Sequence, residues 1–129
     1  MIIVDTSVWV EVFRKSRPLV LESVVSFDEV ATCLPVIQEV LQGFRDERAY
    51  RLARQSFEAL PLVEPLLGLA LFEEAAMLYR AARRAGLTVR SSVDCLIAAC
   101  AIRHDIEVVH RDRDFTALAS VCALRARRI

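Results

Sequence analysis

Short apolar runs alternate along the chain with longer segments in which apolar residues recur at helical spacing. The short runs predict buried strands at residues 1–4, 29–33 and 107–110 and an edge strand at residues 122–125, while residues 60–63 fit either a strand or a turn. Strands that alternate with helices are typical of a parallel sheet with helices on both of its faces. The pattern therefore predicts an α/β fold.

Helical spacing and helix-end signals divide the rest of the chain into helices. Asp5 offers a capping side chain, Pro35 suits an early helical position, and Gly86 suits a helix end. Helices are predicted over residues 8–14, 35–45, 46–59, 69–85, 91–104 and 115–119, with a further short helix over residues 18–25. Residues 93–102 are apolar all round apart from Asp94, so we expect this helix to be central.

The length of 129 residues fits one compact domain, and we expect residues 1–129 to form it. The apolar fraction of 55% supports a substantial core and leaves apolar surface for a partner. The formal net charge is zero, which gives no overall attraction to nucleic acid or membrane but leaves room for a local basic rim. The apolar start is interrupted by Asp5, and no apolar run approaches the ~18 residues that span a bilayer, so we expect no signal peptide and no membrane segment.

The cysteines have no C-x-x-C spacing, and each lies among apolar neighbours; they are Cys33, Cys95, Cys100 and Cys122. This placement predicts buried free thiols rather than zinc ligands or disulfides. Free thiols suit a reducing compartment, so we expect the protein to act in the cytoplasm.

Acidic residues stand at four places where an apolar segment meets a turn or a helix start: Asp5, Glu39, Asp94 and Asp112. Asp5 and Asp112 directly follow predicted strands, and ligands of parallel α/β sheets bind beyond the carboxyl ends of the strands. At about 4 Å and an effective dielectric constant near 20, each pair of carboxylates would repel by roughly 4 kcal/mol. A divalent cation that holds them together is therefore the first hypothesis.

Each acid also has a purely structural interpretation. Asp5, Asp112 and Asp114 suit turns or helix N-caps, and Asp94 suits a capping box with Ser91. Glu39 is harder to explain, because it lies beside, not opposite, the apolar arc of about 140° on its helix. The remaining structural interpretation of Glu39 is a boundary side chain that reaches solvent.

Two neighbours of these acids carry further expectations. Gly43, one turn after Glu39, would leave room beside the carboxylate. His110 is expected to be a strand-end side chain rather than a ligand. Because the acids have no thiolate or imidazole companions, the metal they favour is a hard ion, Mg²⁺ or Mn²⁺.

Four segments in this order resemble the PIN-domain family, and specifically the VapC-type toxins of bacterial toxin–antitoxin pairs. They are Ile3-Val4-Asp5-Thr6-Ser7-Val8-Trp9, Pro35-Val36-Ile37-Gln38-Glu39-Val40-Leu41-Gln42-Gly43, Ser91-Ser92-Val93-Asp94-Cys95-Leu96-Ile97-Ala98-Ala99 and His110-Arg111-Asp112-Arg113-Asp114-Phe115. Each segment alone is a weak signal, but the ordered set in a chain of this size is specific. The resemblance implies a three-layer α/β/α fold around a parallel sheet of four or five strands.

The resemblance also implies a metal-dependent endoribonuclease that cleaves RNA by attack of a metal-activated water, giving 5′-phosphate and 3′-hydroxyl ends. Asp5, Glu39 and Asp94 would hold one ion, and Asp112 would complete its shell or bind a second one. Asp114, an acidic neighbour, would ligate the ion directly or through water. Ser7 would fix a carboxylate or a water, and Arg111 and Arg113 would contact the RNA backbone.

The partners implied are an RNA of the tRNA or rRNA class, a VapB-like antitoxin and a second copy of the chain in a homodimer. The antitoxin would lie over an apolar groove near the acids and carry a basic residue into the acidic pocket. A helical stripe in the predicted helix 69–85 is the candidate apolar surface, although the core would also use it: Leu69, Phe72, Ala76 and Tyr79. Two alternatives stay open, a non-catalytic PIN-like module that binds RNA or protein and a DNA-directed nuclease.

Overall fold

The computed structural model describes residues 1–129 and contains one parallel five-stranded sheet with the strand order β3-β2-β1-β4-β5. Its strands are β1 (Ile2–Val4), β2 (Val30–Cys33), β3 (Leu62–Val63), β4 (Glu107–His110) and β5 (Ala126–Arg128). At the centre of the sheet, Ile3 is in register with Ala31 on one side and Val108 on the other. The predicted α/β fold with a central parallel sheet is confirmed.

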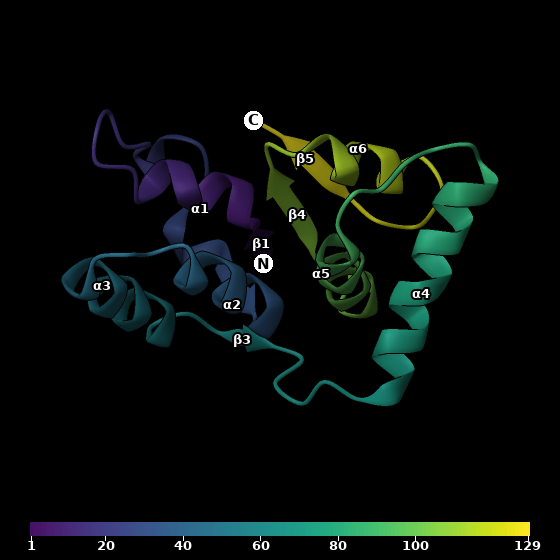
Figure 1. Cartoon of the computed structure of the whole chain (residues 1–129), viewed down its shortest axis with the longest axis horizontal. Coiled ribbons are helices and arrows are strands. Elements are labelled where there is room, and N and C mark those ends of the chain that lie inside the picture. The colour runs from purple at the N-terminus through teal and green to yellow at the C-terminus, as the bar shows by residue number, and fades with distance from the viewer.

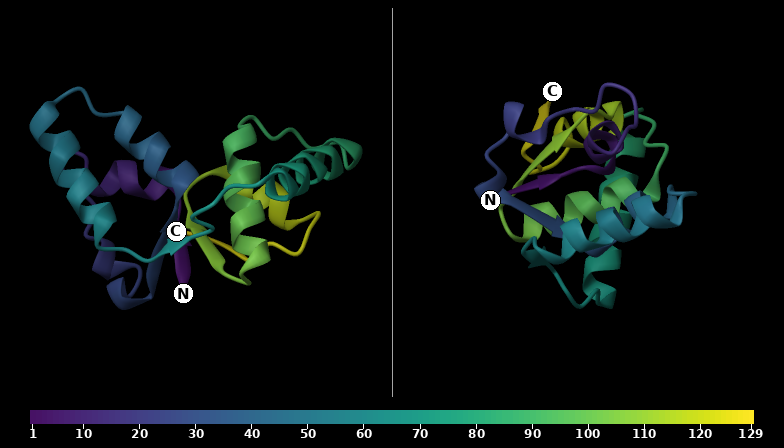
Figure 2. Two further views of the ribbon diagram at one scale, coloured as in Figure 1. Left: turned by 90° about the horizontal axis from the view of Figure 1, so that it is seen from below. Right: turned by 90° about the vertical axis from the view of Figure 1, so that its left-hand side faces the viewer.

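Helices cover both faces of this sheet, as Figures 1 and 2 show. On one side lie α1 (Thr6–Val12), α2 (Leu34–Gln42) and α3 (Glu47–Glu58), and on the other lie α4 (Leu69–Arg84), α5 (Ser92–Arg103) and α6 (Arg113–Ala119). The predicted three-layer arrangement is confirmed. None of the helices combines the length and the apolar character that a bilayer-spanning segment needs.

The core lies between the sheet and the two helical layers. Ile3, Val4, Val108 and Val109 have no solvent exposure, as expected for strands that are covered on both faces. Helix α5 is buried over most of its length, which confirms the central position that its all-round apolar sequence predicts. Its one buried charged residue, Asp94, lies in the first turn at the carboxyl edge of the sheet.

Two predicted elements are wrong. Residues 18–25 form only a short 3-10 turn (Leu21–Ser23), because the Ser23 hydroxyl donates to the Val20 carbonyl and the Leu19 N–H donates back to Glu11 on α1. The left-handed backbone of Arg17 (φ 51°) turns the chain before this segment, and the Arg14 guanidinium donates to its carbonyl. These local hydrogen bonds hold residues 18–25 in turns instead of the predicted helix.

The predicted edge strand at residues 122–125 is displaced to β5. The N–H of Val121 and the thiol of Cys122 both donate to the Leu118 carbonyl, so this apolar stretch continues the turn that ends α6. Strand β5 instead pairs with β4 through charged residues, and Arg127 donates to Glu107 at 3.0 Å. At an open sheet edge these long side chains reach water, so the apolar signal for a strand is missing.

Candidate metal centre

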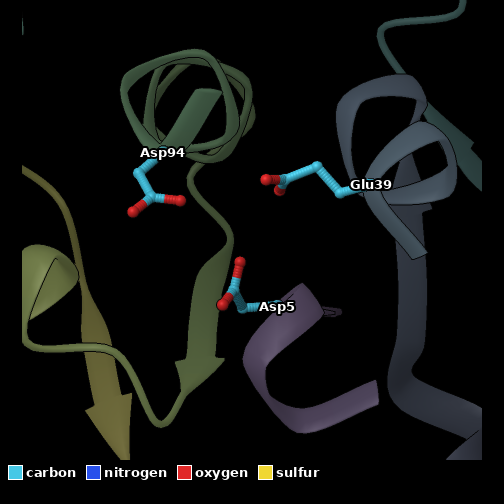
Figure 3. Close-up of side chains that lie close together, drawn as sticks. All are labelled: Asp5, Glu39 and Asp94. Carbon is cyan, nitrogen blue, oxygen red and sulfur yellow. The ribbon is translucent and has the colours of Figure 1, made fainter. Parts of the chain in front are cut away.

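The four acids predicted from the sequence lie on four different elements at the carboxyl edge of the sheet. Asp5 follows β1 and caps α1, and Asp112 follows β4 and caps α6. Glu39 lies within α2, which follows β2, and Asp94 lies in the first turn of α5. Figure 3 shows the carboxylates of Asp5, Glu39 and Asp94 pointing towards one another from three separate segments.

The acids form two groups that share one member. Oxygen atoms of Asp5, Glu39 and Asp94 all lie within 4.8 Å of one another, and so do oxygen atoms of Asp94, Asp112 and Asp114. Ligand atoms on opposite sides of one ion at about 2.0–2.6 Å are roughly 4–5 Å apart, so either group has the dimensions of a single coordination shell. Asp94 is common to both groups and stands at the middle of the centre.

Several carboxylate oxygens in this centre are buried without any hydrogen-bond donor. They are Asp5 Oδ1, Asp94 Oδ2 and Asp114 Oδ1, and each of these side chains is at most 4% exposed. A buried carboxylate oxygen without a hydrogen bond is costly, so Asp5 Oδ1 and Asp94 Oδ2 fit a cation that binds between them. Asp114 Oδ1 has one charged neighbour, the Arg90 guanidinium at 3.6 Å. Because all the donors are oxygen, the centre suits a hard divalent ion.

Burial and the charges of the neighbouring carboxylates act most strongly on Asp94. Burial, followed by the charges of Asp5, Asp112, Glu39 and Asp114, raises its pKa to about 8. Burial also raises the pKa of Asp5, and hydrogen bonds from Ser7 and the Thr6 backbone partly offset that rise. A bound dication would reverse these effects by favouring the ionised carboxylates.

Ser7 connects Asp5 to the loop after β4. Its hydroxyl and its backbone N–H both donate to Asp5 Oδ2, the latter at 2.9 Å, and the same hydroxyl accepts from the Arg111 N–H at 2.9 Å. This arrangement fixes the Asp5 carboxylate with one oxygen occupied and the other, Oδ1, free to face the centre. Ser7 thus has the geometry of a residue that orients a ligand.

Glu39 is half-buried and is held by a residue that the sequence analysis missed. The Thr6 hydroxyl donates to Glu39 Oε1 at 3.0 Å. Thr6 stands between Asp5 and Ser7, and nothing in the local sequence indicates this contact. The expectation for Gly43 is wrong, because a Cβ there would meet the Val40 and Glu39 carbonyls and not the carboxylate.

Asp114 is as deeply buried as Asp5 and is bound by a second missed residue, Arg90. The Arg90 N–H donates to Asp114 Oδ2 at 2.9 Å, while its guanidinium lies 3.6 Å from Asp114 Oδ1 and 3.7 Å from Asp112 Oδ1. Asp112 Oδ1 in turn accepts from the Asp114 N–H at 2.9 Å. The only sequence signal for Arg90 is a basic residue just before the helix that carries Asp94.

Three other residues near the fourth acid do not enter the carboxylate groups. Arg111 and Arg113 are exposed, and the only ion pair of either is a 4.0 Å approach of Arg111 to Glu11. His110 is buried at the end of β4, where its Nδ1 accepts from the Asp112 N–H at 3.2 Å. Burial lowers the pKa of His110, so the ring is neutral and serves as a strand-end support.

The cysteines do not contribute thiolates to the centre. All four are free; Cys33, Cys95 and Cys100 are buried and Cys122 is half-buried. Burial, followed by the negative charge of its neighbour Asp94, raises the pKa of the Cys95 thiol to about 11. The Cys95 thiol therefore stays protonated and behaves as a small apolar residue.

An apolar groove begins beside Glu39 and continues along α4. One hollow of about 260 Å³ is lined by Glu39, Leu67, Phe72 and Leu96 among others, and a second of about 440 Å³ shares Phe72 and Leu96 and extends to Tyr79. The predicted stripe Leu69, Phe72, Ala76 and Tyr79 is exposed and not part of the core. We refer to these two joined hollows as the α4–α5 groove.

Residues 2–121 match the PIN domain, and with this match the chain belongs to the PIN-domain family. It is 42% identical over 134 aligned positions to VapC ribonuclease Mb1587 of Mycobacterium bovis, covering 98% of this chain and 97% of the relative. Ribonuclease VapC11 of Mycobacterium tuberculosis matches with the same identity and coverage. The predicted membership of the PIN-domain family, in its VapC-type branch, is confirmed.

Solved structures share the fold at lower identity. VapBC2 from Rickettsia felis, bound to a DNA fragment from its promoter, superposes with a TM-score of 0.74 at 18% identity, covering 100% of this chain and 99% of that chain. VapC20 from Mycobacterium tuberculosis, described as a sarcin-ricin loop cleaving toxin, superposes with a TM-score of 0.71 at 22% identity, covering 97% of this chain and 99% of that chain.

Proposed function

We propose that this protein is a metal-dependent endoribonuclease toxin of the VapC type, acting in the cytoplasm as one PIN-like domain over residues 1–129. The observation that carries the proposal is the convergence of Asp5, Glu39 and Asp94 around buried carboxylate oxygens that lack any donor. The near full-length identity of 42% to proteins named as VapC ribonucleases supports the same activity.

The residues of the centre have two roles in holding an ion: some would bind it, and others would orient the residues that bind it. Asp5, Glu39 and Asp94 would bind it directly, Ser7 and Thr6 would fix the orientation of the first two carboxylates, and the ion would be Mg²⁺ or Mn²⁺. When bound, such an ion lowers the pKa of a coordinated water and stabilises the charge that develops on a phosphate. Asp112 and Asp114 lie on the other side of Asp94, and we call these three acids together the acidic wall of the centre.

The exposed arginines beside this wall suit the RNA backbone. Arg111 and Arg113 flank Asp112 and are exposed. Arg113 forms no ion pair and Arg111 has only the 4.0 Å approach to Glu11, so both guanidinium groups can meet phosphates. In this position they would draw the substrate over an otherwise repulsive acidic centre. The substrate class we propose is tRNA or rRNA, and the ends produced by water attack are a 5′-phosphate and a 3′-hydroxyl.

The α4–α5 groove is the surface we propose for a VapB-like antitoxin. It is apolar, exposed and continuous with Glu39, so a segment lying in it ends at the acidic centre. A basic side chain entering there would be attracted by the carboxylates and would compete with the ion. Leu69, the one residue of the stripe that lines neither hollow, is 76% exposed and leaves apolar surface for a homodimer contact.

The activity is tested by mapping RNA 5′ ends after incubation with the wild type and with Asp5→Asn. Asp28→Asn is the matched control, because Asp28 is an exposed acid outside the centre. We expect cleavage at few sites by the wild type and Asp28→Asn, with EDTA and Asp5→Asn each abolishing it. Cleavage that persists in EDTA, or ends with a 2′,3′-cyclic phosphate, would rule out the proposal.

The same preparations separate the alternatives. A non-catalytic module would bind RNA or a protein partner with no new 5′ ends in any metal. A DNA-directed nuclease would cut a DNA oligonucleotide of matching sequence at least as fast as the RNA. Either result would replace the ribonuclease by the corresponding alternative.

A further inference from the structure

One arginine lies against the acidic wall of the centre. Arg90 precedes α5, and its backbone N–H donates to Asp114 Oδ2 at 2.9 Å. Its Nε lies 3.6 Å from Asp114 Oδ1 and its Nη2 lies 3.7 Å from Asp112 Oδ1. The guanidinium therefore stands against two of the three carboxylates of the Asp94–Asp112–Asp114 group.

The other group, Asp5–Glu39–Asp94, has no such cation. The side-chain donors to Asp5 and Glu39 are the neutral hydroxyls of Ser7 and Thr6, and Asp94 Oδ2 has no partner at all. None of the ion pairs of the chain involves any of these three acids, although several involve other acids across the surface. The two groups have similar dimensions but differ in whether the chain itself supplies a positive charge.

This difference bears on how many ions the centre can take. Two-metal nuclease sites hold their ions about 3.5–4 Å apart and bridge them with a shared carboxylate, a position that Asp94 would fill here. A second dication among Asp94, Asp112 and Asp114 would have to approach the guanidinium that already stands against Asp112 and Asp114. The positive charges of the ion and the guanidinium would repel each other. In addition, Arg90 already neutralises part of the negative charge of Asp112 and Asp114 that would bind the ion.

We propose that Arg90 is the built-in counter-ion of the Asp94–Asp112–Asp114 group, taking the place of a second metal ion, so that the centre holds one divalent ion at Asp5, Glu39 and Asp94. This inference rests on the proposed function, because it assumes that a divalent ion binds to the centre. Arg90 is a positioning residue in this role, since it acts on the number and place of the ions through Asp112 and Asp114.

The exposure of Arg90 makes the inference testable without unfolding the protein. Its side chain is 56% exposed, and its N–H bond to Asp114 does not depend on the side chain, so Arg90→Gln removes the charge and keeps the loop. Arg90→Lys restores the charge. Arg113→Gln is the matched control, because it removes an exposed charge from the same edge without an ion pair to either group.

The experiment counts Mn²⁺ ions on the RNA-free protein by equilibrium titration, with free Mn²⁺ followed by electron paramagnetic resonance. We expect one ion per chain for the wild type, Arg90→Lys and Arg113→Gln, and two for Arg90→Gln. Two ions on the wild type, or one ion on Arg90→Gln, would overturn the inference while leaving a metal-dependent nuclease intact. No ion on the wild type would instead overturn the proposed function.

Discussion

The Thr6 hydroxyl donates a hydrogen bond to Glu39 Oε1 at 3.0 Å, although the two residues lie 33 positions apart in the chain. Glu39 is the longest of the converging acids and is only half-buried, so it has more rotamer freedom to lose than the aspartates. The hydrogen bond limits that freedom and keeps one carboxylate oxygen towards the centre.

Removing this hydrogen bond should weaken the metal centre without damaging the fold. Thr6→Val keeps the shape of the side chain but loses the donor, and we expect metal affinity and RNA cleavage to fall about 10-fold, as for other residues that orient ligands. Thr6→Ser, which keeps the hydroxyl, should recover most of both. Equal losses in the two variants would show that the methyl packing, and not the hydrogen bond, matters; isothermal titration with Mn²⁺ makes the comparison.

Replacing Asp94 should separate stability from activity. Asp94→Asn should abolish RNA cleavage, because it removes the carboxylate common to both acid groups. It should also raise the free energy of unfolding of the metal-free protein near pH 8 by about 2–4 kcal/mol. The folded wild type must there either keep the Asp94 proton that the unfolded chain has lost or bear a charge among like charges, and a neutral amide needs neither. Urea unfolding in EDTA measures the change.

A stabilised but inactive Asp94→Asn is the expected pair of results, and Asp28→Asn, an exposed acid outside the centre, should change neither. If Asp94 were only the acid of a helix cap, its replacement would instead destabilise α5 slightly and spare cleavage.

Much of this centre is predictable because its acids are tied to local sequence. Asp5 and Asp112 directly follow buried strands, and parallel topology brings strand ends to one edge of the sheet. Asp94 stands out as the lone charge on an otherwise apolar segment, and Glu39 as an acid beside an apolar arc. These signals need no knowledge of which side chains touch.

The missed residues have no comparable local signal. Thr6 and Arg90 act across 33 and 24 positions of sequence, and their partners become visible only when the elements pack together. The misplaced edge strand has a related cause, because the apolar residues 121–122 bond back to α6 while charged residues form β5. Hydrophobic pattern predicts which segments are buried, not which long-range bonds their ends form.

The stability of the metal-free protein should fall as the pH rises from about 4 to about 8. The pKa of Asp94 is raised from an ordinary value of 3.8 to about 8 in the folded state, so the folded chain holds a proton that the unfolded chain has lost over this range. Stability falls with pH wherever the folded state binds more protons. Asp94→Asn should flatten this part of the profile, measured by urea unfolding in EDTA at a series of pH values.

Adding a divalent ion should reverse that trend. Binding at about 100 times the dissociation constant stabilises the folded state by about 2.7 kcal/mol. Because Asp94 must lose its proton to act as a ligand, the gain in melting temperature with Mn²⁺ should be larger at pH 8 than at pH 6. Asp5→Asn should show little gain at either pH, and an equal gain in that variant would mean that the ion binds elsewhere.

Shortening Phe72 should weaken the antitoxin complex. Phe72 lines both hollows of the α4–α5 groove and is 47% exposed, so Phe72→Ala removes an apolar anchor from the surface without opening the core. A buried aromatic anchor in an interface contributes about 2 kcal/mol or more, so we expect affinity for a co-expressed VapB-like antitoxin to fall about 30-fold. Val20→Ala is the control, because Val20 is exposed but lines neither hollow of this groove. Titration calorimetry of the purified chains gives both affinities; an unchanged Phe72→Ala complex would place the antitoxin on another surface.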